Sequence, residues 1–374
     1  MGKKNKKPQD AREGRRCALC GAVAKEEVRA YVVGATGRVV CRDCVDISSR
    51  IMQIPPPAKE PPKVEVSNIL TPRQIIQELD KNIIGQEEAK RAVAIAFWKQ
   101  QLRANGEITV PGCNLLLYGP TGCGKTALAK EAARIVGLPF LTFDSTTLSE
   151  TGYRGRNATD IIEDYAERFR DHPHRSHGIV FLDEADKLAA RGNEARAAYS
   201  RGTQHCLLKL VEGTEVNCDS GKISTDQLLF IFGGAFTGLI SKTSHMRPVG
   251  FLEREDRGEG SRLATTDDFV RYGMEPELMG RVGQYIPVKQ LTAAELKQIL
   301  LESDLSLFRK YQKFFDSRGI RLELGSRRTE EFVQNALARG TGARGLNSLV
   351  EAAMEPLLFR LAEDELREAV SLDG

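Results

Sequence analysis

The chain has 374 residues, of which 41% are hydrophobic and 28% are charged. This composition is typical of a folded protein with a large core, and the length predicts two or three domains. The net charge of +3 is too small to indicate nucleic-acid binding by itself, and no apolar run is long enough to cross a bilayer. We therefore expect a cytoplasmic protein, or one of an organelle matrix, whose eight cysteines are metal ligands or free thiols before disulfides.

The first 70 residues divide into three segments. Residues 1–16 are polar and mostly basic, which predicts a disordered tail. Residues 17–52 contain two cysteine pairs, Cys17 with Cys20 and Cys41 with Cys44, each separated by two residues. Four thiolates close the shell of a tetrahedral ion, so this module predicts a structural zinc site, with reduced free thiols as the alternative. Residues 53–70 are rich in proline, which predicts a stiff extended linker.

The remainder of the chain predicts an α/β domain followed by a helical one. Thr71 and Pro72 carry the side chains expected at the start of a helix. Between residues 71 and 288, apolar strands at 114–118, 179–182 and 228–232 alternate with helical stretches, which predicts a parallel sheet. Residues 289–374 are predicted to form a smaller domain of amphipathic helices, for example over 293–315 and 329–338.

A phosphate-binding loop follows the first of these strands. Gly119-Pro120-Thr121-Gly122-Cys123-Gly124-Lys125-Thr126 has the spacing G-x4-G-K-[ST] and is expected to open a helix. The glycines allow backbone N–H groups to converge on phosphate oxygens at the positive end of that helix. Lys125 is expected to neutralise the β- and γ-phosphates of ATP, and the Thr126 hydroxyl to bind Mg²⁺.

The residues from Gly152 to Gly155, Gly-Tyr-Arg-Gly, lie between the two halves of the predicted ATP site. An aromatic ring flanked by glycines suits a flexible loop that grips a polypeptide, because the ring supplies contact area and the glycines let the loop move. Alone, the tetrapeptide would indicate a surface turn. Its position leads us to predict that Tyr153 and Arg154 contact substrate.

Acidic and basic residues complete the predicted catalytic site. Asp183 and Glu184 follow the apolar strand at 179–182, where Asp183 is expected to hold the magnesium shell and Glu184 to polarise the attacking water. Arg281 precedes the helical domain, and Arg344 stands at the start of a helix inside it. We predict that both stabilise charge on the γ-phosphate, Arg281 from a neighbouring subunit and Arg344 within the same chain.

Taken in this order, these residues resemble the AAA+ ATPases of the Clp group, and most closely the ClpX-type unfoldases. The resemblance covers nearly the whole chain and includes Ile83-Ile84-Gly85-Gln86 and Gly233-Gly234-Ala235-Phe236. It implies an α/β AAA+ P-loop domain with a parallel sheet, a small helical C-terminal domain and a preceding four-cysteine zinc-binding module. It also implies ATP, Mg²⁺ and Zn²⁺ as cofactors, Ile83 and Ile84 as adenine contacts, and a homo-hexamer whose Tyr153 loops pull polypeptide through a central pore.

The sequence also departs from the familiar pattern of that family. Arg154 replaces the usual valine, and residues 215–225 are much shorter than the usual insertion and lack its basic Arg-Lys-His loop. The loop that docks a ClpP-type peptidase normally presents Ile-Gly-Phe, where this chain has Val249, Gly250 and Phe251. The apolar anchor is preserved, so docking is still expected, whereas the missing basic loop means that the sequence does not predict the usual recognition of substrate tags.

These features lead to one predicted function and two alternatives. We predict an ATP-dependent unfoldase and translocase, not itself a peptidase, that feeds unfolded or tagged proteins and adaptor-bound substrates to a ClpP-type peptidase. The first alternative is a stand-alone remodelling chaperone, which the shortened loops suggest. The second is a nucleic-acid-dependent AAA+ ATPase, suggested by the zinc module, the basic tail and Arg154 with Arg156, although nucleic acid and membrane are not expected partners.

Overall fold

The computed structural model describes residues 16–21, 30–33, 38–51, 69–107, 110–148, 156–239, 263–363 and 369–372. The chain divides into two compact units, Met1–Lys63 and Val64–Gly374. Within the described residues, none of the helices combines the length and apolar character that a membrane span requires. The predicted domain boundaries all stay predictions, and most of the predicted tail at 1–16 and of the predicted linker at 53–70 lies outside the described residues.

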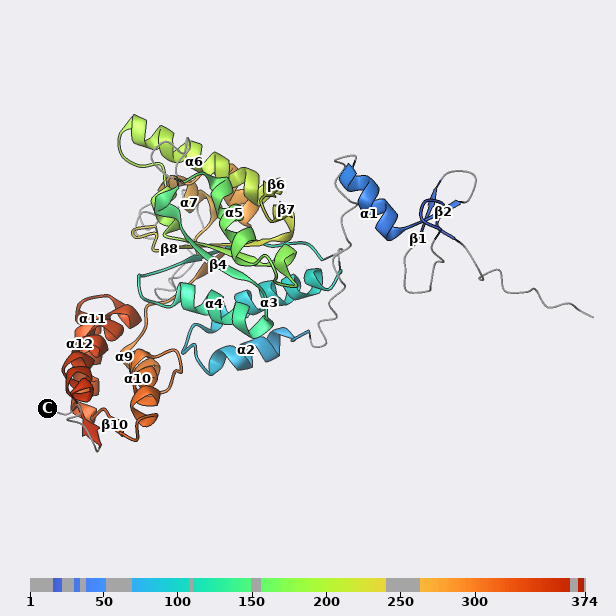
Figure 1. Ribbon diagram of the computed structural model, residues 1–374. Helices are drawn as coiled ribbons and strands as arrows, with labels where there is room; N and C mark the ends of the chain where they lie inside the picture. The colour runs from blue at the N-terminus through green and yellow to red at the C-terminus, as the bar shows by residue number, and fades with distance from the viewer. Residues whose placement is uncertain are drawn as a thin grey trace, which may run out of the picture. The chain divides into compact units, whose positions relative to one another are not determined.

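The N-terminal unit contains a hairpin followed by a helix. Strands β1 (Ala30–Val33) and β2 (Arg38–Cys41) pair in antiparallel fashion, and α1 (Arg42–Ile51) follows directly (Figure 1). The hairpin ends at Cys41, so the second cysteine pair lies across the start of α1. The side chains of Cys17, Val40 and Cys41 are buried together and form a small core in this unit.

A parallel five-stranded sheet forms the centre of the second unit. Its spatial order is β4-β5-β8-β3-β9, with every neighbouring pair parallel. The strands are β3 (Leu115–Tyr118), β4 (Phe140–Asp144), β5 (Ile179–Asp183), β8 (Leu229–Gly234) and β9 (Gln284–Pro287). Every residue of β3 and β8 is buried, as expected for strands covered on both faces. The predicted parallel sheet is confirmed, with strand ends shifted by one or two residues.

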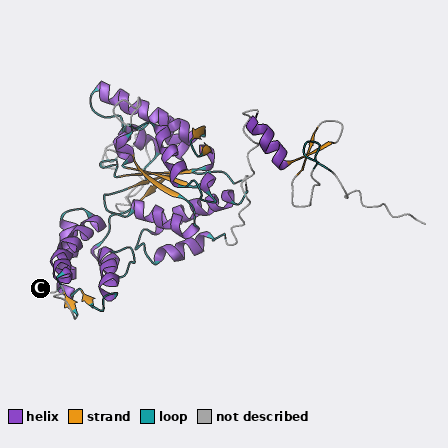
Figure 2. Ribbon diagram, viewed as in Figure 1, coloured by secondary structure: helices purple, strands orange, loops and turns teal. Residues whose placement is uncertain are grey.

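Helices cover both faces of this sheet (Figure 2). On one face they pack against Leu115 and Leu117, and on the other against Leu116 and Tyr118. This alternation follows from the two-residue period of a strand. The first layer contains α2 (Pro72–Asp80), α3 (Glu87–Ala104) and α4 (Lys125–Val136), and the second contains α5 (Ala158–Arg168), α6 (Glu194–Glu212), α7 (Thr266–Tyr272) and α8 (Pro276–Val282).

Two local features of this domain are the start of α2 and the hairpin after α6. Thr71 caps α2, and its side chain and that of Gln74 bond each other's backbone, so the predicted helix start is confirmed. The short segment after α6 forms a tight antiparallel hairpin of β6 (Glu215–Cys218) and β7 (Gly221–Ser224). Short 3-10 turns lie at Ser145–Thr147, Arg175–His177, Ala185–Leu188 and Thr225–Gln227.

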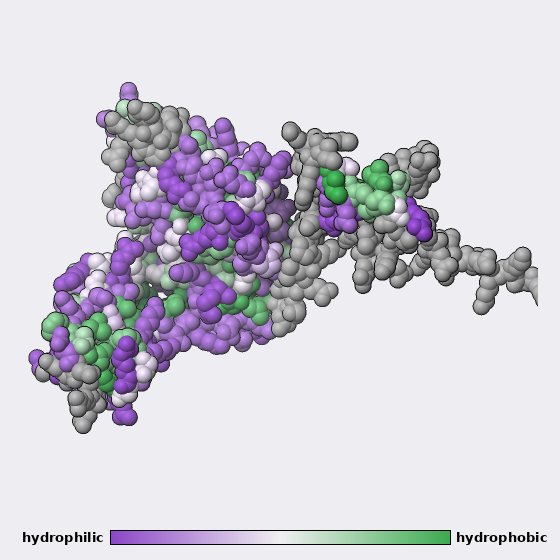
Figure 3. All heavy atoms as spheres, in the orientation of Figure 1, coloured by the Kyte–Doolittle hydropathy of each residue, from purple (hydrophilic) through white to green (hydrophobic). Residues whose placement is uncertain are grey.

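The C-terminal residues form a small helical domain with its own core. Its elements are α9 (Ala293–Leu301), α10 (Leu307–Asp316), α11 (Ser326–Ala338) and α12 (Gly342–Ala362), with the short parallel strands β10 (Leu322–Glu323) and β11 (Val370–Ser371). Figure 3 shows apolar residues on the surface of this domain, whereas the visible face of the α/β domain is mostly hydrophilic.

The continuous helix predicted over residues 293–315 is wrong, because the chain breaks between α9 and α10. The Ser306 hydroxyl donates to the carbonyl of Leu300 at 2.8 Å, and the Leu305 N–H donates to the Ser303 hydroxyl at 3.2 Å. Serine hydroxyls compete with the helical hydrogen bonds of the backbone in this way. The periodicity of apolar residues continues across the break, so the sequence pattern alone did not reveal it.

Candidate functional site

The predicted phosphate-binding loop joins the carboxyl end of β3 to the start of α4. Lys125, the first residue of α4, is 9% exposed, and its ammonium group donates to the carbonyls of Gly119 at 2.7 Å and Pro120 at 2.9 Å. These contacts hold the cation inside the curve of the loop. The amino end of α4 adds the partial positive charge of its free N–H groups, so the site is suited to an anion.

The carboxylates at the end of β5 face this loop. The Thr126 hydroxyl donates to Asp183 Oδ2 at 3.0 Å, and the backbone N–H of Glu184 donates to Asp183 Oδ1 at 2.9 Å. Both carboxylate oxygens of Asp183 are therefore fixed in place. Glu184 is exposed and its backbone has φ = 54°, a left-handed conformation that is unfavourable for a residue with a side chain. Such strain is often found at functional positions.

The small helical domain supplies the third wall of the site. The N–H of Ala343, in the first turn of α12, donates to the carbonyl of Gly122 at 3.0 Å. A cavity of about 300 Å³ lies between α4, the end of β5, the end of β8 and α12. Thr121, Gly122, Gly124, Lys125, Thr126, Asp183, Glu184 and Arg344 line it, all of which the sequence had predicted for the ATP site.

The cavity also contains residues to which the sequence assigned no role. They are Ala127, Asp186, Lys187, Gly234, Ala235, Ala343 and Asn347. Asp186 Oδ1 accepts a hydrogen bond from the N–H of Ala235 at 3.0 Å, which fixes the end of β8 to the turn after β5. Asn347 could have been found from its spacing, because it follows Arg344 by three residues and so lies on the same face of the helix.

The donor set fits a nucleotide with its magnesium ion. Lys125 and the start of α4 suit phosphate, and the Thr126 hydroxyl and the Asp183 carboxylate are the hard oxygen ligands that Mg²⁺ prefers. The Thr126–Asp183 contact of 3.0 Å already brings these two oxygens together. The residues present therefore fit Mg²⁺ without rearrangement of the two elements that carry them.

Arg281 does not line this cavity. It lies in α8, where its guanidinium group contacts Glu212 Oε1 through Nη2 at 2.9 Å and Nε at 3.1 Å. Its carbonyl accepts from the side chain of Asn114, the residue before β3. The phosphate-binding loop follows the carboxyl end of β3, so the backbone of Arg281 lies at the opposite, amino end of this strand. A four-residue strand is about 13 Å long, which separates the Arg281 backbone from this chain's ATP site.

The other predicted site residues have different positions. Ile83 is buried among α2, α3 and α4 and Ile84 is half-buried, and neither lines the cavity, so their contact with adenine stays a prediction. Tyr153 and Arg154 lie outside the described residues, as do Val249, Gly250 and Phe251.

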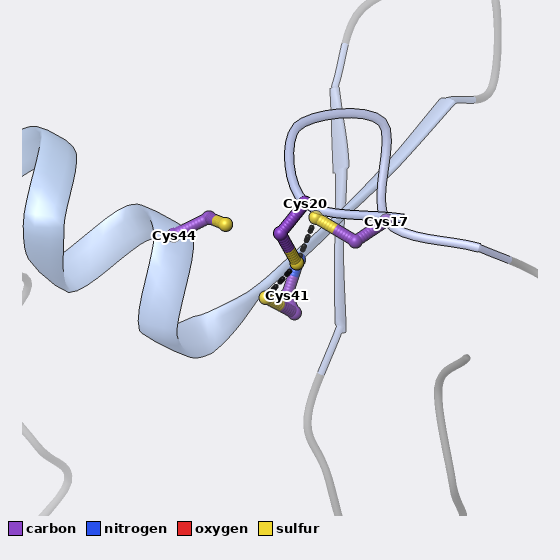
Figure 4. Close-up of side chains that lie close together, drawn as sticks. All are labelled: Cys17, Cys20, Cys41 and Cys44. Atoms are coloured by element: carbon purple, nitrogen blue, oxygen red, sulfur yellow. Dashed lines mark hydrogen bonds between the residues drawn. The ribbon is translucent and has the colours of Figure 1, made fainter. Parts of the chain in front are cut away.

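The four predicted zinc ligands come together in the N-terminal unit (Figure 4). Cys17 and Cys20 lie on a turn, Cys41 ends β2 and Cys44 lies in α1, and their sulfur atoms are all within 4.8 Å of one another. Cys20 Sγ and Cys41 Sγ are 3.6 Å apart. Two sulfurs of a tetrahedral shell with Zn–S bonds of about 2.3 Å would be about 3.8 Å apart, so the cluster fits zinc.

One hydrogen bond favours a thiolate in this cluster. The N–H of Cys41 donates to Cys17 Sγ at 3.2 Å. This bond is the largest cause that lowers the pKa of Cys17 to about 6. A thiolate is the form that binds metal.

Comparison with known proteins agrees with this fold. Residues 111–285 match the AAA domain (Cdc48 subfamily), and residues 291–370 match the C-terminal, D2-small domain, of ClpB protein. The fold and the site therefore define an AAA+ P-loop ATPase.

Two curated relatives identify the branch of that class. The chain is 32% identical over 372 residues to the "ATP-dependent Clp protease ATP-binding subunit ClpX" of Treponema denticola, covering 92% of this chain and 89% of that protein. It is 31% identical over 379 residues to the protein of the same name from Borrelia duttonii, covering 92% and 86%. The chain belongs to the ClpX-type AAA+ ATPases.

Proposed function

We propose that this protein is an ATP-dependent unfoldase that feeds substrates to a ClpP-type peptidase. The observation that carries the proposal is the cavity in which Lys125, Asp183, Glu184 and Arg344 come together from both domains. The names of the relatives, which describe an ATP-binding subunit of a Clp protease, support the same activity. A cytoplasmic location and a zinc ion on the four cysteines belong to the proposal.

Residues of both domains have different roles in the proposed hydrolysis of ATP. Lys125 neutralises the β- and γ-phosphates, and Thr126 and Asp183 hold Mg²⁺, which withdraws electron density from the phosphate oxygens when bound. Glu184 accepts a proton from the attacking water at a carboxylate oxygen. Arg344, which belongs to the small domain, neutralises charge that develops on the γ-phosphate.

A ring of subunits completes the proposed machine. The backbone of Arg281 lies at the amino end of β3, whereas this chain's phosphate-binding loop lies at the carboxyl end. This position supports a role in which Arg281 contacts the ATP of a neighbouring subunit in a homo-hexamer. A head-to-tail contact of this kind forms a ring when its rotation between subunits closes. Hydrolysis then moves the Tyr153 loops, which pull an unstructured tail until the attached domain unfolds. Because domains are typically stable by only about 5–15 kcal/mol, repeated pulls on a weak local element suffice.

A second candidate is a stand-alone remodelling chaperone that works without a peptidase. The tight β6–β7 hairpin favours it, because it occupies the position of the longer insertion of other ClpX proteins. Degradation of a fluorescent tagged protein, with ATP and with or without a ClpP-type peptidase, separates the two candidates. Fluorescence loss that needs the peptidase supports the first, and ATP-dependent unfolding without any peptidase binding supports the second. Phe251→Ala should abolish peptidase binding in the first case.

Glu184→Gln tests the assignment of the catalytic base. We expect the variant to bind ATP while its hydrolysis falls about 10²- to 10⁴-fold, because the amide does not accept the proton. Glu302→Gln, at an exposed glutamate of the small domain, is the matched control and should hydrolyse ATP normally. Near-normal turnover by Glu184→Gln would remove the assignment.

Tyr153→Ala tests the proposed grip on substrate. The variant should keep most of the ATPase activity and lose the unfolding of a tagged protein, because the aromatic contact area is gone. Tyr153→Phe keeps the ring and should retain unfolding. Intact unfolding by Tyr153→Ala would contradict the proposed role of this loop.

A further inference from the structure

The segment 82–86, between α2 and α3, is bonded directly to the chain that leads into the small domain. The Gln86 side chain accepts from the N–H of Lys289 at 2.9 Å and donates to the carbonyl of Lys289 at 2.8 Å. Lys289 lies on the connection between β9 and α9, and therefore between the two domains. One carboxamide thus satisfies both backbone groups of this residue, as a neighbouring strand would.

Asn82, at the other end of the same segment, reaches the small domain itself. Its carbonyl accepts from the hydroxyl of Ser303 at 2.7 Å, and its Oδ1 accepts from the N–H of Asp304 at 3.2 Å. Its Nδ2 donates to Glu131 Oε1 at 2.7 Å, and Glu131 is a buried residue of α4. Asn82 therefore joins the helix of the phosphate-binding loop to the turn between α9 and α10.

Two further features show that this segment is held tightly. Gln86 has φ = 63°, a left-handed conformation that a residue with a side chain adopts only when its surroundings impose it. A Cβ atom on Gly85 would lie 2.1 Å from Glu295 Oε1, in the first turn of α9. The segment thus contacts the small domain at Asn82 and Gly85, and the connection between β9 and α9 at Gln86.

The position of the small domain decides where Arg344 lies. The start of α12 donates to the Gly122 carbonyl and carries Arg344 into the ATP cavity. We propose that Asn82 and Gln86 are positioning residues, which fix the small domain against the P-loop domain and so set the place of Arg344 beside the phosphates. This inference rests on the proposed ATPase function.

The first test replaces Gln86 by methionine in the full chain, which keeps the length of the side chain and removes both hydrogen bonds. We expect kcat/KM for ATP to fall about tenfold, which corresponds to about 1.4 kcal/mol. Gln100→Met is the matched control, because Gln100 donates to the carbonyls of His177 at 2.8 Å and Gln227 at 2.7 Å within the large domain. Gln100 is 3% exposed, so its loss should lower the melting temperature and leave kcat/KM unchanged.

A double-mutant cycle then separates positioning from general destabilisation. If the two amides act by placing Arg344, Gln86→Met should have little further effect in an Arg344→Ala background. Asn82→Leu removes a separate contact, and its effect on kcat/KM should likewise be small in the Arg344→Ala background. It replaces Gln86→Met in the cycle if that variant does not fold. Equal loss in both backgrounds, or unchanged kcat/KM in a folded variant, would overturn the inference while leaving the ATPase intact. Absence of Glu184-dependent hydrolysis in the unmodified protein would instead refute the proposed function.

Discussion

Gly342→Ala is a direct perturbation of the contact between the small domain and the phosphate-binding loop. A Cβ atom at this position would lie 2.6 Å from the carbonyl oxygen and 2.9 Å from the carbonyl carbon of Gly122. Both neighbours are backbone atoms, so the start of α12 must move away from the loop. That movement stretches the hydrogen bond of 3.0 Å between the Ala343 N–H and the Gly122 carbonyl.

The variant should affect the stability of the protein and its affinity for ATP through different contributions. Gly342 has φ = 53°, and a left-handed alanine costs roughly 1–2 kcal/mol in stability. The lost hydrogen bond adds about 1 kcal/mol, which acts on the arrangement that binds nucleotide. With the displacement of the loop backbone, we expect the dissociation constant of ATP to rise about tenfold, equivalent to about 1.4 kcal/mol.

Gly340→Ala is the matched control for the backbone strain. Gly340 lies two residues earlier in the same turn with φ = 62°, and a Cβ atom there would meet nothing within 4 Å. Both variants should therefore lose the stability that a left-handed alanine costs, with a larger loss for Gly342→Ala because of the close approach to Gly122, and only Gly342→Ala should weaken binding of a fluorescent ATP analogue in the presence of Mg²⁺. Equal nucleotide affinities for the two variants would refute the argument that this close approach supports the ATP site.

Three further predictions concern other parts of the protein. Cys41→Ser should release the metal, detected with a colorimetric zinc chelator, without lowering the melting temperature of the ATPase unit, because the two units are separate compact bodies. Thr126→Ala removes the hydroxyl that bonds Asp183 and should raise the Mg²⁺ concentration needed for half-maximal hydrolysis, whereas an unchanged requirement would contradict its role as a ligand. Burial is the main cause that lowers the pKa of His177 to about 4, so the unfolded chain binds its proton first and stability should fall as the pH drops from about 6.5 to about 4. Denaturant titrations of His177→Gln should show a weaker dependence over this range.

Much of the fold followed from local patterns. Apolar strands bounded by helices predicted the parallel sheet, and Thr71 with Pro72 predicted the start of α2. The break between α9 and α10 was missed, because it depends on the hydroxyl of Ser306 and on the Ser303–Asn82 contact rather than on apolar periodicity. Asn82 itself is 221 residues away from Ser303 and 222 from Asp304, so no short segment contains the signal.

The sequence alone predicted the chemistry of the two centres. It predicted roles for Lys125, Thr126, Asp183 and Glu184 because a phosphate-binding loop and a strand ending in carboxylates are compact motifs, and for the four cysteines because their spacing suits one ion. Only the tertiary structure decided how the domains are joined at the ATP site, through Gln86 and Lys289, Asn82 and Ser303, and Gly122 and Ala343. The physical reason is that a motif encodes contacts between near neighbours in sequence, whereas these hydrogen bonds exist only once distant segments have packed together.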